Sequence, residues 1–125
     1  MKRSTAAVIW AEEQVAMLQP ILNIQHWKID VTYDKHLDAA WAETCFWFNR
    51  HAATVTLGVP FLADGRAKRE QVMLHELVHI QHEDTMALTR VVMKPQVERL
   101  FWAMEEKAVD DMATTLHGLI YGCHP

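Results

Sequence analysis

The chain has 125 residues, half of them apolar and 22% charged, with a formal net charge of −4 at pH 7. This length suits one domain over residues 1–125, and the composition is that of a globular rather than a disordered protein. The negative charge and the lack of a lysine–arginine cluster exclude the usual electrostatic basis for binding nucleic acid or an anionic membrane surface.

The N-terminal part of the chain predicts a helix followed by a strand. Ser4 or Thr5 can cap a helix whose apolar residues recur at helical spacing towards Gln19, and Pro20 closes it. We expect this helix to back the rest of the domain. Apolar and polar residues alternate with period two over residues 27–33, which predicts a half-buried strand.

The middle of the chain predicts two further strands. Residues 41–48 are rich in aromatic side chains, and residues 53–57 contain several β-branched ones. The short stretch of residues 49–51 separates them, which favours a hairpin. Together with the strand over residues 27–33, the hairpin predicts a three-stranded antiparallel sheet.

Two long helices are predicted in the second half of the chain. Glycine and proline residues interrupt the pattern after the last strand, and a helix then runs from Arg66 to about Asp84. A last helix has Pro95 in its first turn and ends near Gly118 or Gly122. The order of one helix, three strands and two helices describes a single α+β domain.

Cysteine usage and hydropathy predict a cytoplasmic protein. The two cysteines, Cys45 and Cys123, are too few for a disulfide scaffold and too far apart for a cysteine-based zinc site, so we expect reduced thiols. The apolar stretch over residues 6–11 is interrupted at once by Glu12 and Glu13, so no signal peptide is expected. No segment reaches the length of a membrane span.

The predicted helix from Arg66 contains the motif H-E-x-x-H, in which His75 and His79 flank Glu76. Two histidines four residues apart project from one helix face, where both imidazoles can coordinate one ion at about 2.0–2.1 Å. Glu76 then lies beside the ion, where it can act as a general base towards water. Glu76 is also the only charged residue over residues 72–81, and a nearby cation would offset the cost of burying it.

The alternative interpretation of this segment needs no metal. An ordinary buried helix would have His75 and His79 bonded to backbone carbonyl groups and Glu76 reaching the solvent. The two interpretations differ in where Glu76 lies and in what the imidazoles face.

A catalytic zinc site needs a third protein ligand. His82 lies seven residues beyond His75, roughly 10.5 Å along an unbroken helix, so these two cannot share an ion. In the E-x-x-x-D pattern formed by Glu106 and Asp110, the chain resembles the gluzincin clan of zinc peptidases, whose third ligand is a glutamate on a later helix. By this resemblance Glu106 would bind the metal, and Asp110 would orient one of the metal histidines.

Other residues remain open as the third ligand. Helical angles place Glu105 near the centre of the apolar face of the last helix, whereas Glu106 lies at its edge with Asp110. Glu105 is therefore the reserve candidate. His117 as a ligand would look more like a Spartan-type protease, and without any metal the glutamates would form a solvated acidic patch.

The resemblance implies a minimal zincin-like domain, as in small prokaryotic and phage-type single-domain peptidases. Such a domain has an N-terminal backing helix, the three-stranded antiparallel sheet, an active-site helix and a C-terminal helix that bears the glutamate. By fold analogy, an edge strand beside the active-site helix pairs with extended substrate, and residues 55–59 are the candidate by position.

The function implied is a zinc-dependent peptidase that acts on a peptide or protein. Zn²⁺ would be held by His75, His79 and Glu106, and peptide bonds would be hydrolysed through a metal-activated water with Glu76 as general base. The alternative is a zinc-stabilised binding or regulatory module without hydrolytic activity. Glu76 distinguishes the two, because a structural zinc site needs no adjacent carboxylate.

Overall fold

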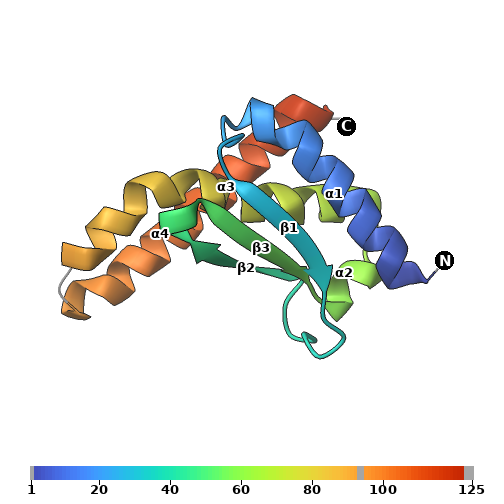
Figure 1. The fold of residues 1–125 in the computed structure, drawn as a ribbon, viewed down its shortest axis with the longest axis horizontal. Helices are drawn as coiled ribbons and strands as arrows, with labels where there is room; N and C mark the ends of the chain where they lie inside the picture. The colour runs from blue at the N-terminus through green and yellow to red at the C-terminus, as the bar shows by residue number, and fades with distance from the viewer. Residues whose placement is uncertain (1, 93–94, 123–125) are drawn as a thin grey trace.

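Four α-helices, one short 3₁₀ helix and three strands make up residues 2–92 and 95–122, the part of the chain that the computed structural model describes. In chain order the elements are α1 (Arg3–Ile21), β1 (Lys28–Tyr33), β2 (Ala42–Trp47), η1 (Phe48–Arg50), β3 (Ala52–Leu57), α2 (Val59–Ala63), α3 (Arg66–Val92) and α4 (Pro95–Tyr121). The α+β class predicted from the sequence is confirmed. Figure 1 shows α3 and α4 running side by side and extending beyond the sheet.

The sheet is mixed, with the strand order β1-β3-β2. The predicted hairpin is confirmed, since β2 and β3 are antiparallel, with Thr44 opposite Val55. The prediction of a wholly antiparallel sheet is wrong, because β3 pairs in parallel with β1 and sets Val31 opposite Val55. Turn chemistry determines only the hairpin, whereas packing of the hairpin on the rest of the domain decides which of its strands lies beside β1.

Side chains of the sheet alternate between a face covered by helices and an open face. On β3 the covered face is fully apolar, with Ala53, Val55 and Leu57 buried. The neighbouring positions on β2 include Thr44, whose hydroxyl therefore points towards the helices. Helix α1 packs on β1, α3 packs on β2, and the two helices pack on each other, so both cover this same face.

Helix α3 is the central element of the core. Five of its apolar side chains have no exposed surface: Met73, Leu74, Leu77, Val78 and Ile80. All of them except Val78 belong to the core cluster that includes side chains of α1 and the sheet. Burial of each such side chain contributes about 1.5–3 kcal/mol, so this part of α3 is firmly held. Its remaining face, which carries the H-E-x-x-H motif, is left to line a cleft.

Helix boundaries differ from prediction at several ends. Helix α1 begins at Arg3 with no side-chain cap from its N-cap residue, and Pro20 lies in its last turn rather than beyond it. Helix α3 continues to Val92, well past the predicted end near Asp84. Helix α4 ends at Tyr121, and Gly122 follows with a φ of 84°, the left-handed conformation that often terminates a helix.

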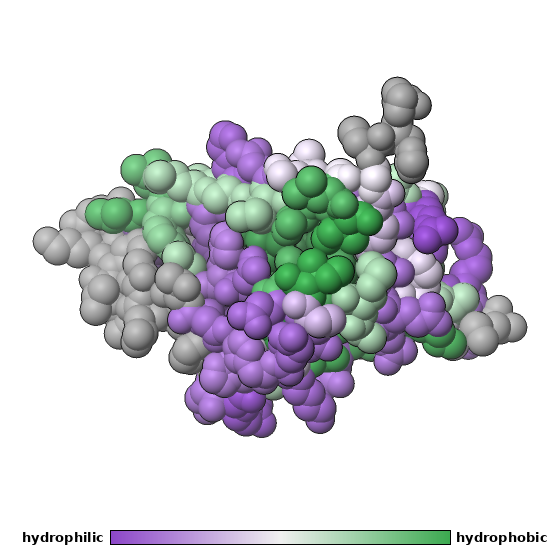
Figure 2. Space-filling view, turned by 90° about the horizontal axis from the view of Figure 1, so that it is seen from above, coloured by the Kyte–Doolittle hydropathy of each residue, from purple (hydrophilic) through white to green (hydrophobic). Residues whose placement is uncertain are grey.

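The surface carries several exposed apolar side chains. Ile9, Met17 and Ile21 of α1 and Leu119 of α4 are among them. Figure 2, which looks onto the top of Figure 1, shows hydrophobic side chains gathered near the middle with hydrophilic ones beside them. Within residues 2–92 and 95–122, no helix combines the length and apolar character needed to cross a lipid bilayer.

Candidate metal centre

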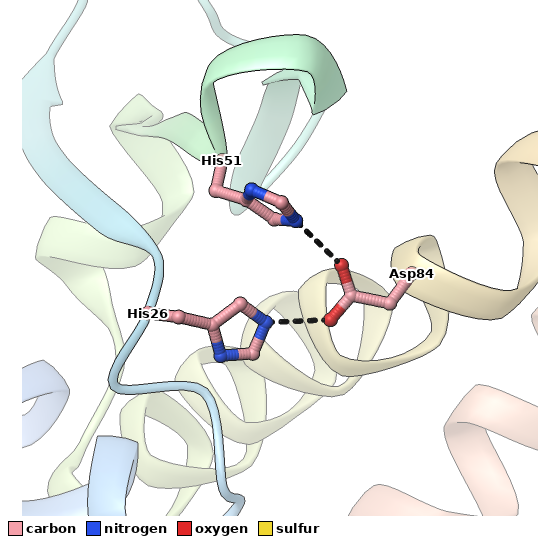
Figure 3. Close-up of side chains that lie close together, drawn as sticks. All are labelled: His26, His51 and Asp84. Carbon is pink, nitrogen blue, oxygen red and sulfur yellow. Dashed lines mark hydrogen bonds and ion pairs between the residues drawn. The ribbon is translucent and has the colours of Figure 1, made fainter.

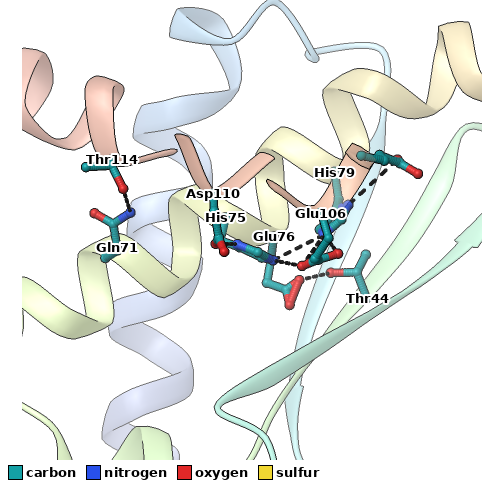
Figure 4. A network of polar contacts seen from close by, with 9 residues as sticks. Thr44, Gln71, His75, Glu76, His79, Glu106, Asp110 and Thr114 are labelled. Carbon is teal, nitrogen blue, oxygen red and sulfur yellow. Dashed lines mark hydrogen bonds and ion pairs between the residues drawn. The ribbon is translucent and has the colours of Figure 1, made fainter. Parts of the chain in front are cut away.

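The nitrogen atoms of two histidines of α3 and a carboxylate of α4 converge on one point (Figure 4). His75 Nε2 lies 3.2 Å from His79 Nε2 and 2.7 Å from Glu106 Oε1. His79 Nε2 lies 3.4 Å from Glu106 Oε1 and 3.2 Å from Oε2. One atom from each residue falls within 4.8 Å of the others.

These separations can be compared with those of a zinc site. Ligand atoms at 2.0–2.1 Å from a tetrahedral zinc ion lie about 3.3 Å from one another. The separation of the two imidazole nitrogens, 3.2 Å, and the longer separations to Glu106 fit this value. The 2.7 Å contact between His75 and Glu106 is shorter, at the length of a hydrogen bond. The donor set therefore suits zinc, with a small outward movement of the carboxylate needed to admit it.

The tautomer of His75 also suits metal binding. Its Nδ1 lies 2.7 Å from Asp110 Oδ1. An ionised carboxylate can only accept a hydrogen bond, so Nδ1 carries the proton and donates it to Asp110. In the neutral ring the lone pair then belongs to Nε2, the atom that faces His79 and Glu106. Asp110 thus occupies the position that the resemblance to gluzincins implied.

The two adjacent glutamates of α4 lie in different environments. The Glu105 side chain is only 4% exposed and its Oε1 is 4.0 Å from Nδ1 of His79, on the far side of that ring. The Glu106 side chain is 55% exposed and reaches Nε2 of both histidines. The structure therefore brings Glu106, and not the reserve candidate Glu105, to the point of convergence.

Glu76 is buried beside the two histidines with 6% of its surface exposed. Thr44 of β2 donates a hydrogen bond from Oγ1 to Glu76 Oε2 at 3.0 Å. Burial raises the pKa of Glu76 to about 7, and the carboxylates of Glu106 and Glu43 add to this rise. His75 and the hydrogen bond from Thr44 act in the opposite direction and lower it. A carboxyl group with this pKa can both accept and release a proton near neutral pH.

The structure does not show the contacts that the metal-free interpretation predicted for Glu76 and His75. Glu76 does not reach the solvent, and the His75 ring bonds to side chains of α4 rather than to backbone carbonyls. His79 is also set up as a neutral ligand, because burial lowers its pKa and outweighs the opposing effect of Glu106. A neutral imidazole is the form that binds a metal ion.

A cleft runs along β2 past the two histidines. A hollow of about 440 Å³ lies between β2 and Trp102 of α4, and another of about 310 Å³ lies towards Trp41 and Lys68. His75 and Glu76 line both hollows. The edge strand of this cleft is β2, so the assignment of residues 55–59 to that position is wrong. Those residues begin in β3, which is the central strand.

Two other histidines considered as ligands lie elsewhere. His117 pairs with the buried Glu70 at 3.1 Å, and its ring lies beside Tyr121. Among the described residues, neither His117 nor His82 belongs to a group of three convergent metal-ligand atoms. The structure therefore offers no support for His117 as the third ligand.

The contact of Thr44 with Glu76 was not predicted from the sequence. A polar residue in a predicted strand was the only sequence feature that could have indicated it, because the structure is what places Thr44 on the face of β2 towards the helices. The site as a whole joins two imidazoles, one accessible carboxylate and one buried carboxyl group at the wall of a cleft. A scan against protein-family models found no match, and neither did searches of curated proteins and of solved structures.

Proposed function

We propose that this protein is a zinc-dependent peptidase with Glu76 as its general base. The observation that carries the proposal is the convergence of His75 Nε2, His79 Nε2 and the Glu106 carboxylate beside a buried glutamate whose pKa is about 7. A zinc site used only for structure closes with four protein ligands. Three ligands with an adjacent proton acceptor favour chemistry instead.

Each residue of the site has a part in the proposed reaction. His75, His79 and Glu106 would hold the zinc ion, which when bound would supply Lewis acidity towards a peptide carbonyl and lower the pKa of water. Glu76 accepts a proton from the attacking water and delivers it to the leaving amine nitrogen. Thr44 orients the Glu76 carboxylate through their 3.0 Å hydrogen bond. Asp110 keeps the lone pair of His75 on Nε2.

The shape of the cleft favours an extended peptide as substrate. β2 is an edge strand that pairs with β3 on one side, and residues 42–46 of β2 line the hollow in front of the histidines. An extended peptide can add to such an edge through backbone hydrogen bonds, which do not depend on its side chains. This arrangement supports a peptide or an unfolded protein segment and gives no basis for a narrow sequence preference.

The first test is the metal content of protein purified without chelator, measured by mass spectrometry. We expect bound zinc in the wild type and one equivalent less in His79→Ala and in Glu106→Ala. Asp111→Ala is the matched control, because Asp111 is an exposed carboxylate of the same helix that pairs with Lys107. A wild-type protein that holds no zinc at this site even when zinc is supplied would end the proposal.

The second test is hydrolysis of a library of quenched fluorescent peptides. We expect Glu76→Gln to keep its zinc and to lose activity by at least about 10²-fold, the contribution typical of a general base. A wild type that binds zinc but cleaves no peptide would favour the alternative, a zinc-stabilised binding or regulatory module.

A further inference from the structure

A second group of metal-ligand side chains lies away from the H-E-x-x-H motif (Figure 3). It consists of His26 in the connection between α1 and β1, His51 between η1 and β3, and Asp84 on α3. His26 Nε2 is 2.7 Å from Asp84 Oδ2, and His51 Nε2 is 3.3 Å from Asp84 Oδ1. One ligand atom from each residue falls within 4.8 Å of the others.

The backbone holds the two histidines next to each other. Lys28 N, at the start of β1, donates a hydrogen bond to the carbonyl oxygen of His51 at 2.8 Å. His51 has a φ of 46°, in the left-handed region that few residues other than glycine adopt. This turn conformation directs the His51 ring towards α3. The start of β1 and the turn at His51 are therefore joined directly through the backbone.

Trp27 supports the same group from behind. Its indole Nε1 donates to Asp84 Oδ2 at 3.4 Å, and its ring meets the His51 ring edge-on, with 5.2 Å between centroids. Trp27 itself belongs to the hydrophobic core, with 2% of its surface exposed. A buried tryptophan thus orients both a carboxylate and an imidazole, which is how supporting residues position metal ligands.

The donor set indicates the kind of ligand. Two imidazoles and one carboxylate suit divalent ions of the first transition series, whereas Ca²⁺ and Mg²⁺ prefer oxygen ligands alone. The side chains of His26, His51 and Asp84 are 48%, 43% and 34% exposed, so water can complete the coordination of an ion. The 3.3 Å separation between His51 and Asp84 equals the spacing expected of neighbouring ligands, about 3.3 Å.

We propose that His26, His51 and Asp84 form a second metal site, which takes Zn²⁺ or a similar divalent transition ion. The ion would tie the α1–β1 connection and the β2–β3 hairpin to α3, the helix that also carries His75 and His79. Its role is to stabilise the position of α3 against the sheet. The site is independent of the peptidase proposal, because the two groups share no residue.

The test is a zinc titration of the full chain, with competition against a chelating dye and with stoichiometry measured by mass spectrometry. We expect two zinc ions per wild-type chain and one in His51→Asn, His26→Gln and Asp84→Asn, with affinity for the lost ion weakened at least about tenfold. Asparagine is chosen at residue 51 because it tolerates a positive φ. His36→Ala is the control, since His36 is exposed and belongs to neither group.

The outcomes separate the two proposals. Loss of one ion in the His51→Asn, His26→Gln and Asp84→Asn variants, with none lost in His79→Ala, would support the second site and overturn the first. A wild type whose single ion is lost in His79→Ala would overturn the second site. Retention of both ions in folded His51→Asn and folded His26→Gln would overturn it as well, and thermal unfolding of each variant checks that it is folded.

Discussion

At the scale of single residues, adjacent positions on α4 have opposite surroundings. Glu105, Val109 and Ala113 are its buried described side chains, spaced four apart on the face towards α3. Glu106 and Asp110 lie one position further round, at the border of that face, where they reach the histidines from the solvent side. A ligand that must meet both a metal ion and the substrate cleft belongs at such a border rather than at the centre of a packed face.

Asp110 should matter more for zinc affinity than its neighbour Asp111. Asp110→Asn weakens the hold on the proton at His75 Nδ1, so we expect zinc affinity at the proposed catalytic site to fall about 10- to 100-fold. Asp111→Asn changes a similarly exposed carboxylate of the same helix, which pairs with Lys107 rather than with a histidine, and should leave the zinc affinity unchanged. Chelator competition measures both, and equal affinities in the two variants would contradict the role given to Asp110.

Glu76 should make the metal-free protein sensitive to pH. Its pKa is 4.5 in the unfolded chain and about 7 in the folded one, so folding favours the protonated form. This contribution to the free energy of unfolding is fully present below pH 4.5 and is lost as the pH rises through about 7. The total loss is on the order of 3 kcal/mol.

Glu76→Gln replaces this group with a neutral side chain of the same shape. In the presence of chelator, we expect the variant to gain stability over the wild type between about pH 5 and pH 8. Urea unfolding at several pH values measures the difference, and comparison of the two proteins cancels the other titrating groups. Parallel pH profiles would contradict the raised pKa of Glu76.

At the scale of elements, the β1–β2 connection is held against the start of α2 by a glycine. Gly58 N donates to Trp41 O at 2.8 Å, and Val59 N donates to Leu37 O at 2.7 Å. A Cβ atom on Gly58 would lie 2.1 Å from Ala40 O and 2.8 Å from Leu37 O. Both neighbours are backbone atoms, so they cannot yield without moving a connection that lines the cleft.

Gly58→Ala should therefore destabilise the protein by about 1–3 kcal/mol or more, as overpacking does. Gly65→Ala is the matched control, because a Cβ atom there meets nothing within 4 Å. We expect the control to stay within about 1 kcal/mol of the wild type. Urea unfolding of both variants gives the comparison, and an equal effect at the two positions would contradict the close approach at Gly58.

At the scale of the whole molecule, the proposed catalytic site is the junction between α4 and the rest of the domain. Few of the described side chains of α4 are buried, and near residues 105–110 Glu106 and Asp110 add contacts with His75 and His79 to the packing of Val109. Towards its end, Tyr121 bonds to Gln14 of α1 at 2.5 Å. A zinc ion at the site would join the two long helices directly.

Removal of zinc should loosen α4 selectively. We expect chelator to speed hydrogen exchange of backbone amides over residues 105–113, with little change in α1, whose side chains pack in the main core. Exchange measured by mass spectrometry on peptide fragments checks this. His79→Ala should show the faster exchange without chelator, and a chelator effect that persists in this variant would assign the change to another metal site.

The sequence alone determined the local features of this protein. Helical spacing predicted the three long helices α1, α3 and α4, period-two alternation predicted β1, and aromatic and β-branched residues predicted β2 and β3. The short separation of β2 and β3 predicted their hairpin, and helical spacing placed His75 and His79 on one face with Glu76 beside them. These features depend on residues close together in the chain, where spacing translates directly into direction. The E-x-x-x-D pattern also named Glu106 and Asp110, although only by resemblance.

Tertiary structure decided what depends on distant residues. In the sheet, β3 rather than β2 lies beside β1, so the sheet is mixed. This order also leaves β2 as the edge strand that lines the cleft. The contact of Thr44 with Glu76 and the meeting of His26, His51 and Asp84 join segments up to 58 residues apart. No local pattern encodes such meetings, because they follow from how the buried faces of α1, α3 and the sheet fit together in one core.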